Sequence, residues 1–211
     1  ALVGAVDRAE REEYRALVIE VDTPGGLETS MRTMVKRMLV AEVPIIAYVC
    51  PAGARAASAG VFIVMAADVA AMAPGTNIGA ATPVNLQGGM DSTLARKATS
   101  DAAAFARTVA RQRNRNAKWA EEAVRRAVAA SDSEAVALDV VDMVAGSLDD
   151  LLEQVDGRAI SRPGLETRLR LVGLPRDVIE PSLRQKLLGV LVDPNIAYIL
   201  MLLGFYGLLF E

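Results

Sequence analysis

Ser58 is a candidate nucleophile because it stands between Ala57 and Ala59-Gly60, residues too small to shield its hydroxyl, where a helix is predicted to begin. A second glycine turn, Pro24-Gly25-Gly26, follows a predicted strand. Backbone N–H groups at such turns are unpaired and the helix dipole adds positive charge, so they can form an oxyanion hole. The ordinary alternative is that Ser58 caps a helix or allows close packing. Local sequence alone favours that alternative.

A serine nucleophile needs a base, and the chain of 211 residues has no histidine and one cysteine. This composition excludes Ser-His-Asp and Cys-His pairs, an internal disulfide and a Cys-rich zinc site. The base must therefore be Lys, Asp, Glu, Tyr or Cys50. Neither a phosphate-binding Gly-x-x-x-x-Gly-Lys nor an acidic calcium-loop pattern occurs, and we expect no cofactor and no metal.

Lysine can act as the base when it is neutral, which requires its pKa to fall by about two to four units from about 10.4. The four lysines are at positions 36, 97, 118 and 186. Lys97 is the strongest candidate, because it begins a predicted helix at the edge of its buried stripe, just after a flexible loop. Its ordinary alternative is a surface lysine paired with Asp101 one turn further on.

The elements around these residues follow from hydrophobic spacing and turn residues. Strands are predicted at residues 16–21, 44–50, 69–73 and 137–145. Helices are predicted at residues 27–39, 61–67, 93–113, 117–129 and 148–155, with a short one capped by Ser131 and Glu134. Strands that alternate with helices indicate an α/β fold with largely parallel strands.

Charge and composition limit the partners. The chain has 23 basic and 26 acidic residues and 4% aromatic residues, which argues against nucleic acid. Residues 156–186 are rich in Arg, Pro and Gly and are interpreted as a linker or small irregular subdomain. Residues 187–211 are almost uncharged and are interpreted as the start of a transmembrane segment, interrupted by Asp193-Pro194. The ordinary alternative is an amphipathic or core-packing terminal helix. The basic residues within 156–186 flank this segment, and such flanks usually stay on the cytoplasmic side of the membrane. Both ends of the chain are interpreted as cut from a longer protein.

Several motifs in order make the chain recognisable: Asp22-Thr23-Pro24-Gly25-Gly26, Ala56-Ala57-Ser58-Ala59-Gly60, the run from Met72 to Ala81, and Asp193-Pro194-Asn195. This set resembles the NfeD-type membrane-bound serine proteases. These are relatives of the Clp protease and signal peptide peptidase A, with the layered ClpP/crotonase fold. The resemblance covers nearly the whole chain and implies a serine protease domain over residues 1–155.

The resemblance also implies roles for residues. Ser58 would be the nucleophile and Lys97 the general base of a Ser-Lys dyad, and the backbone amides of Gly25 or Gly26 and of Ala59 would form the oxyanion hole. Family members cut hydrophobic segments of membrane-associated partners, notably stomatin or prohibitin-like proteins, and assemble at least as dimers. Their signal sequence implies that the protease domain lies on the extracytoplasmic side of the membrane, contrary to the basic flank.

Two hypotheses from other classes remain. A non-catalytic membrane scaffold would keep the protease-like domain only to bind partners. An acyl-CoA enzyme of the crotonase type would share the fold and its paired backbone amides. The serine, the lysine and the apolar tail together favour the serine endopeptidase.

Overall fold

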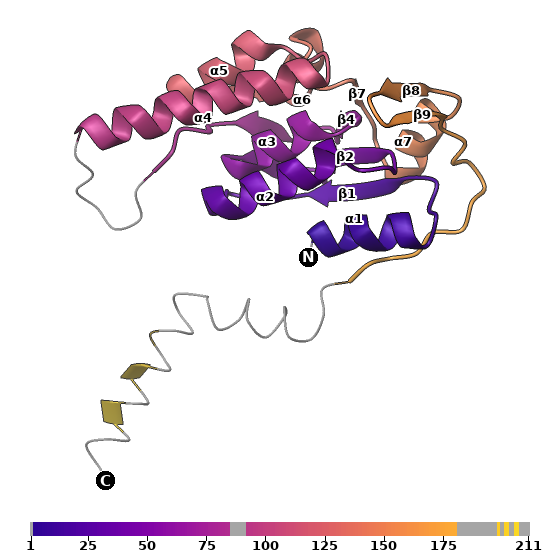
Figure 1. Ribbon diagram of the computed structural model, residues 1–211, viewed down its shortest axis with the longest axis horizontal. Coiled ribbons are helices and arrows are strands. Elements are labelled where there is room, and N and C mark those ends of the chain that lie inside the picture. Colours follow the sequence, from indigo (N-terminus) through magenta and orange to yellow (C-terminus); the bar gives the residue numbers. More distant parts are fainter. Residues whose placement is uncertain (1, 85–91, 181–197, 199–200, 203–204, 207–211) are drawn as a thin grey trace. The chain divides into compact units, whose positions relative to one another are not determined.

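The computed structural model describes residues 2–84, 92–180, 198, 201–202 and 205–206. One compact unit spans Leu2–Leu174, and a second begins at Pro175. The first unit has an α/β fold with a parallel sheet and flanking helices, as predicted (Figure 1). In chain order its elements are α1 (Leu2–Arg11), β1 (Leu17–Val21), α2 (Glu28–Leu39), β2 (Ile45–Val49), β3 (Arg55–Ala57), α3 (Ala59–Ala66), β4 (Val69–Met72), β5 (Asn77–Gly79), α4 (Ser92–Gln112), α5 (Ala117–Arg125), β6 (Ala129–Ser131), α6 (Asp132–Ala137), β7 (Met143–Val144), α7 (Leu148–Val155), β8 (Ala159–Arg162) and β9 (Leu165–Arg168).

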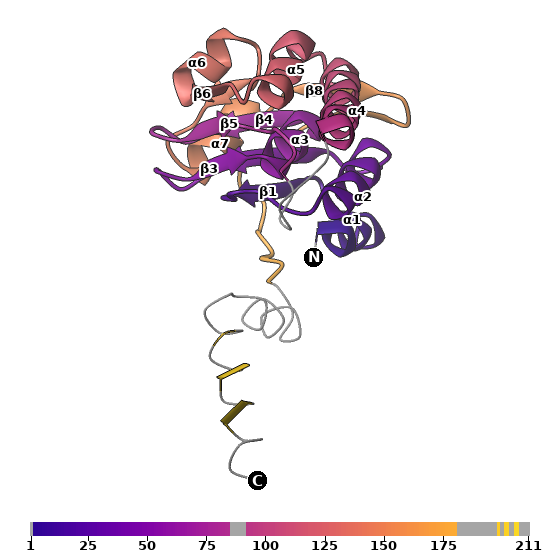
Figure 2. The same cartoon turned by 90° about the vertical axis from the view of Figure 1, so that its left-hand side faces the viewer.

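The main sheet has four parallel strands in the order β1-β2-β4-β7. All five residues of β2 are buried, which is expected of a parallel strand covered on both faces. On one face, Ile46 and Tyr48 join a core cluster with Leu151 of α7 and Ile160 of β8. In Figure 2, α4, α5 and α6 lie together on one side of the strands.

A second sheet, in the order β3-β5-β6, was not predicted from the sequence. Its strands have three residues each, too few to give a hydrophobic period, and β3 lies inside a run of small residues. This sheet is important for the candidate site, because β3 ends at the residue before Ser58.

Two predicted elements are shorter than expected. The strand predicted at 137–145 contracts to Met143–Val144, because the capping box of Ser131 and Glu134 begins α6, which includes Ala137. Asp139 then turns the chain with a φ of 55°. The helix predicted at 117–129 ends at Arg125, and Ala129 begins β6.

Residues 156–174 contain the β8–β9 hairpin, which lies within the first compact unit. The predicted transmembrane segment, 187–211, lies almost entirely outside the described residues. Among the residues that are described, no helix is both long and apolar enough to cross a membrane. The domain boundaries at 155 and 186 stay predictions.

Asp68 is the centre of a buried ionic cluster. Its Oδ1 atom lies 2.6 Å from Nε of Arg162 in β8 and 3.3 Å from Nε of Arg113, which follows α4. All three side chains are at most 7% exposed. Because Asp68 Oδ2 also accepts the Ile45 N–H at 2.9 Å, this one carboxylate connects β2, the end of α4 and the hairpin.

We expect Asp68→Asn to lower the free energy of unfolding by about 3 to 5 kcal/mol, because it leaves two buried guanidinium groups without their counter-charge. Asp7→Asn is the control, since Asp7 is half exposed in its ion pair with Arg37 and should cost less than about 1 kcal/mol. Urea unfolding of both variants measures the difference. Equal losses would show that the buried cluster does not stabilise the fold.

Candidate active site

Ser58 stands on a sharp turn between β3 and α3. Its φ of 53° and ψ of −112° lie outside the regions that residues with a side chain usually occupy. The Ser58 N–H donates to the Gly79 carbonyl at the end of β5, at 3.1 Å, which holds the turn in place. The Ser58 hydroxyl does not cap the helix, contrary to the ordinary alternative. Backbone strain of this kind is concentrated at functional sites.

The glycine turn lies directly against Ser58. Thr23 pairs with β3 through its N–H to the Arg55 carbonyl at 2.7 Å and its carbonyl to the Ala57 N–H at 3.0 Å. This pairing places Gly25 next to Ser58. A Cβ atom added to Gly25 would lie 3.1 Å from Ser58 Cβ. The two predicted turns are therefore adjacent in space, although Ser58 follows Gly26 by 32 positions in the sequence.

The structure distinguishes among the three amides proposed for an oxyanion hole. The Gly25 N–H donates to Thr23 Oγ1 at 3.1 Å and is therefore already used. Within the described residues, the Gly26 and Ala59 N–H groups donate to no acceptor. A Cβ atom on Gly26 would contact Ala59 Cβ at 3.6 Å, so the two free amides belong to neighbouring residues. Gly26 and Ala59 are the better pair of donors.

Lys97 lies near the beginning of α4, which runs in the same direction as α3. The ring of Phe105 in α4 stacks on Phe62 of α3 at 5.7 Å, and further along Arg113 Nε donates to the Ala66 carbonyl at 2.9 Å. Lys97 precedes Phe105 by about 12 Å of helix. Lys97 therefore lies toward the N-terminal end of α4, and Ser58 precedes the N-terminal end of the neighbouring helix α3.

Lys97 is exposed and has no ion-pair partner within the described part of the chain. The predicted alternative, a pair with Asp101, is wrong, because Asp101 pairs with Arg32 of α2. Arg32 also lies 4.5 Å over the Phe105 ring, which fixes this part of α4 against α2. The structure thus brings Ser58, Gly26 and Ala59 together, and it shows no hydrogen bond between Ser58 and Lys97.

Other candidate bases and nucleophiles are poorly suited. Burial raises the pKa of the Cys50 thiol to about 11, and the charges of Glu20 and Asp22 add to this effect. Cys50 is therefore protonated near neutral pH. The Tyr48 hydroxyl is buried and donates to the Ala145 carbonyl at 2.8 Å. Among the described residues, no group of His, Cys, Asp and Glu side chains could hold a metal ion.

We expect Gly25→Ala to reduce activity at least about tenfold, because the new methyl group would press on Ser58 Cβ and the φ of 148° is unfavourable for alanine. Gly164→Ala is the matched control. Gly164 also has a positive φ, 81°, but open space around its Cβ position, and it lies in the β8–β9 hairpin. Steady-state hydrolysis of one peptide by both variants gives the comparison. Equal activities would contradict the close contact at Ser58.

Comparisons with known proteins agree with this fold. The family model described as NfeD1b, N-terminal domain, matches residues 2–154. The membrane-bound protease PH1510 of Pyrococcus horikoshii is 35% identical over 205 residues, which are 95% of this chain and 46% of that protein. Membrane protein NfeD1b of Bacillus subtilis is 31% identical over 198 residues, 92% of this chain and 43% of that protein. The chain spans about half the length of these curated relatives.

Solved structures give the same result. The 1510-N membrane-bound stomatin-specific protease, as a lysine-to-alanine mutant in complex with a substrate peptide, matches with a TM-score of 0.80. It is 32% identical, and the match covers 89% of this chain and 88% of that one. A serine-to-alanine mutant of the same protease matches with a TM-score of 0.76, also at 32% identity, over 84% of this chain and 87% of that one.

Proposed function

Because the chain belongs to the NfeD1b N-terminal domain family, we propose that it is a serine endopeptidase with a Ser58-Lys97 dyad. The observation that carries the proposal is the strained turn at Ser58, with the unpaired Gly26 and Ala59 N–H groups beside it. Two free amide donors next to an accessible hydroxyl are the arrangement that acyl transfer requires.

In the proposed mechanism, neutral Lys97 removes the proton of the Ser58 hydroxyl, and Oγ attacks the carbonyl carbon of the peptide bond. The Gly26 and Ala59 N–H groups donate to the oxygen that becomes negatively charged in the tetrahedral intermediate. The Lys97 ammonium then protonates the leaving amine. Neutral again, Lys97 activates a water molecule that hydrolyses the acyl enzyme and releases Ser58.

The assignment of Lys97 is supported by its place in the fold. It is on the helix that follows the third motif, at the end that corresponds to Ser58, and no acidic residue in the described chain holds it. The solved relatives include mutants in which a lysine and a serine of the protease were replaced by alanine. A base that approaches its nucleophile closely only when substrate is bound is common among enzymes.

We propose hydrophobic segments of membrane-associated proteins, such as stomatin-like or prohibitin-like partners, as substrates. Three large apolar side chains on segments leading to the site are exposed: Leu27 after the glycine turn, Val84, and Leu94 in the first turn of α4. Exposed apolar side chains of this size are typical of binding surfaces when they are grouped. The solved relative is a protease specific for a stomatin homologue.

For the whole protein, we propose a membrane-bound homodimer or higher homo-oligomer. Residues 1–155 form the protease domain, residues 156–186 connect it, and residues 187–211 begin a transmembrane segment. The protease domain lies on the extracytoplasmic side. The relatives support membrane association, since both curated proteins are membrane proteins.

Mass spectrometry of products from a panel of synthetic peptides tests the function. We expect cleavage within peptides that carry an uninterrupted apolar stretch and at least about tenfold slower cleavage of matched peptides with one central aspartate. Binding of the apolar peptides without any cleavage would support the scaffold alternative instead. Binding of CoA would support the acyl-CoA alternative.

A further inference from the structure

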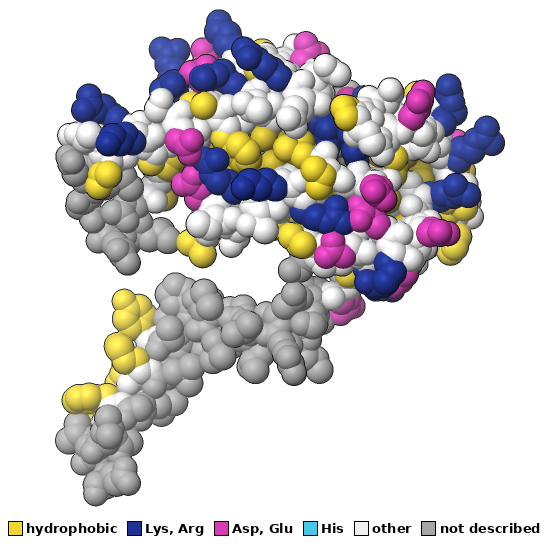
Figure 3. All heavy atoms as spheres, viewed as in Figure 1, with side chains coloured by type: hydrophobic (Ala, Val, Ile, Leu, Met, Phe, Trp, Pro, Cys, Tyr) yellow, Lys and Arg dark blue, Asp and Glu magenta, His cyan; other side chains and the backbone are white. Residues whose placement is uncertain are grey.

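Basic residues are concentrated on the α4–α5 helix pair. Residues 92–126 contain nine basic and three acidic residues, although the whole chain has a net charge of −3. Of these nine, Arg113 forms an ion pair with the buried carboxylate of Asp68, and Arg115 forms one with the partly buried carboxylate of Asp142. In the space-filling view, Lys and Arg side chains gather over α4 and α5 (Figure 3).

The acidic residues of this helix pair do not neutralise it. The Glu121 carboxylate forms one ion pair with Arg107, across the two helices, and a second with Arg125, within α5. Within the described chain, the side chains of Arg96, Arg111 and Lys118 form no ion pair. We call Arg96, Arg107, Arg111, Lys118 and Arg125 the basic face.

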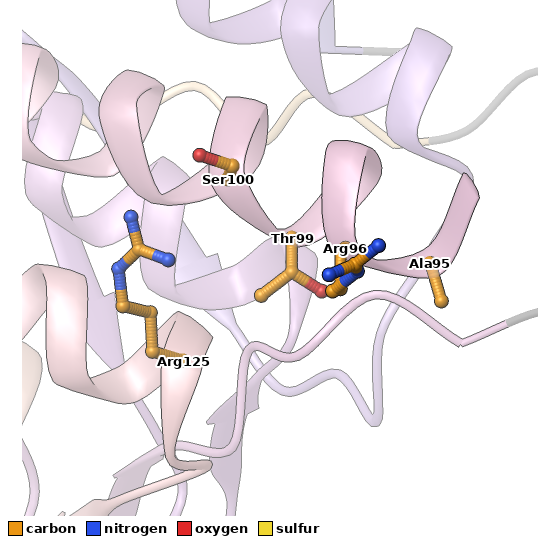
Figure 4. A pocket seen from close by; sticks show the side chains of 5 residues that line it. All are labelled: Ala95, Arg96, Thr99, Ser100 and Arg125. Atoms are coloured by element: carbon orange, nitrogen blue, oxygen red, sulfur yellow. The ribbon is translucent and has the colours of Figure 1, made fainter. Parts of the chain in front are cut away.

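The basic face follows the α4–α5 helix pair from one end to the other. Arg96 and Arg125 line an open pocket at one end, together with the hydroxyl-bearing residues Thr99 and Ser100 (Figure 4). Farther along, the Arg107–Glu121 ion pair links the two helices. Arg111 lies one turn beyond Arg107, and Lys118 lies three residues before Glu121, at the other end. From Arg96 to Arg111 the array extends for about 22 Å.

We propose that the basic face docks on an anionic lipid surface. Its length suits a row of phosphate headgroups, and the pocket can take one headgroup between Arg96 and Arg125. Aromatic stacking platforms, which single-stranded nucleic acid would need, are lacking on this helix pair: Phe105 stacks on Phe62, and Trp119 is 6% exposed. The relatives are membrane proteins, so an anionic bilayer is the charged surface nearest to such a domain.

Charge reversal on the full chain tests this docking. Each basic residue near an anionic bilayer multiplies the partition coefficient by roughly five. We would compare wild type with Arg111→Glu/Lys118→Glu, neither of which belongs to the proposed dyad. The matched control is Arg15→Glu/Lys36→Glu, which changes the net charge equally at exposed positions outside α4 and α5. Circular dichroism confirms that both variants fold.

The measured quantity is the ratio of partition coefficients for phosphatidylglycerol-containing vesicles and pure phosphatidylcholine vesicles. Any contribution of the apolar C-terminal segment to both vesicle types cancels in this ratio. We expect the ratio to exceed about ten for wild type and the control, to fall at least tenfold in the basic-face variant, and to fall as salt is raised.

Three results would overturn the proposal. The first is a wild-type ratio near one, and the second is an equal fall in both variants, which would reflect net charge alone. The third is loss of vesicle binding when inorganic phosphate is added as a competitor at constant ionic strength. Such a loss would show that the basic face binds a small anion rather than a lipid surface. Tighter binding to a short DNA or RNA duplex, lost in the same variant, would favour nucleic acid instead.

Discussion

Ser58→Ala should abolish hydrolysis of an apolar peptide, with a loss in kcat of about ten-thousandfold or more. The variant lacks the oxygen that forms the acyl enzyme, and losses of this size are typical when a nucleophile is removed. The fold should not change, because the Ser58 hydroxyl makes no cap hydrogen bond and the turn is held by backbone contacts to Gly79 and the Thr23 loop.

Ser133→Ala is the matched control for this substitution, since Ser133 is exposed on α6. It should retain wild-type activity. Unfolding midpoints in urea for both variants should agree with wild type within experimental error. Retained hydrolysis by Ser58→Ala would remove Ser58 from the mechanism, whatever the control shows.

Lys97→Ala should reduce kcat by a factor similar to that of Ser58→Ala, because the two residues act as a unit and their effects are not additive. Lys97→Arg should be equally inactive, although it keeps the positive charge, since a guanidinium group cannot lose its proton in a protein. Lys36→Ala and Lys36→Arg, at an exposed lysine of α2, should both be active. An active Lys97→Arg enzyme would show that position 97 supplies charge rather than a base.

The pH dependence distinguishes a base from a positioning residue. Only the neutral amine accepts a proton, so wild-type hydrolysis should rise from neutral to alkaline pH when chemistry limits the rate. In Lys97→Ala, a small added amine such as methylamine should restore part of the activity, and more so at higher pH. A flat pH profile in wild type together with no rescue would contradict the general-base role.

Strong periodic patterns predicted the main elements of the fold. The apolar stretch before Asp22 and the apolar run from Val61 to Ala67 correctly indicated β1 and α3, because burial leaves uninterrupted apolar runs that are visible in the sequence. The Ser131-Glu134 capping box correctly marked the start of α6. The three-residue strands of the second sheet could not be found in this way, because they are held by partners distant in the chain.

The candidate site was predictable in its residue types but not in its geometry. Glycines and a serine among small residues indicated backbone donors, yet nothing local shows that Gly25 lies against Ser58 or that its N–H is taken by Thr23. Likewise, the spacing of Lys97 and Asp101 suggested a pair, but Arg32 of another helix binds Asp101 instead. Tertiary contacts decided both outcomes.

The most direct test of the Ser58-Lys97 dyad is the intact mass of the protein after treatment with a fluorophosphonate, followed by mapping of the modified residue. We predict one adduct, on Ser58, whose formation is abolished in Ser58→Ala, slowed at least a hundredfold in Lys97→Ala, and unchanged in Lys36→Ala. An unlabelled wild-type protein that is folded and cleaves the peptides, or an adduct that forms equally fast without Lys97, would contradict the proposed dyad.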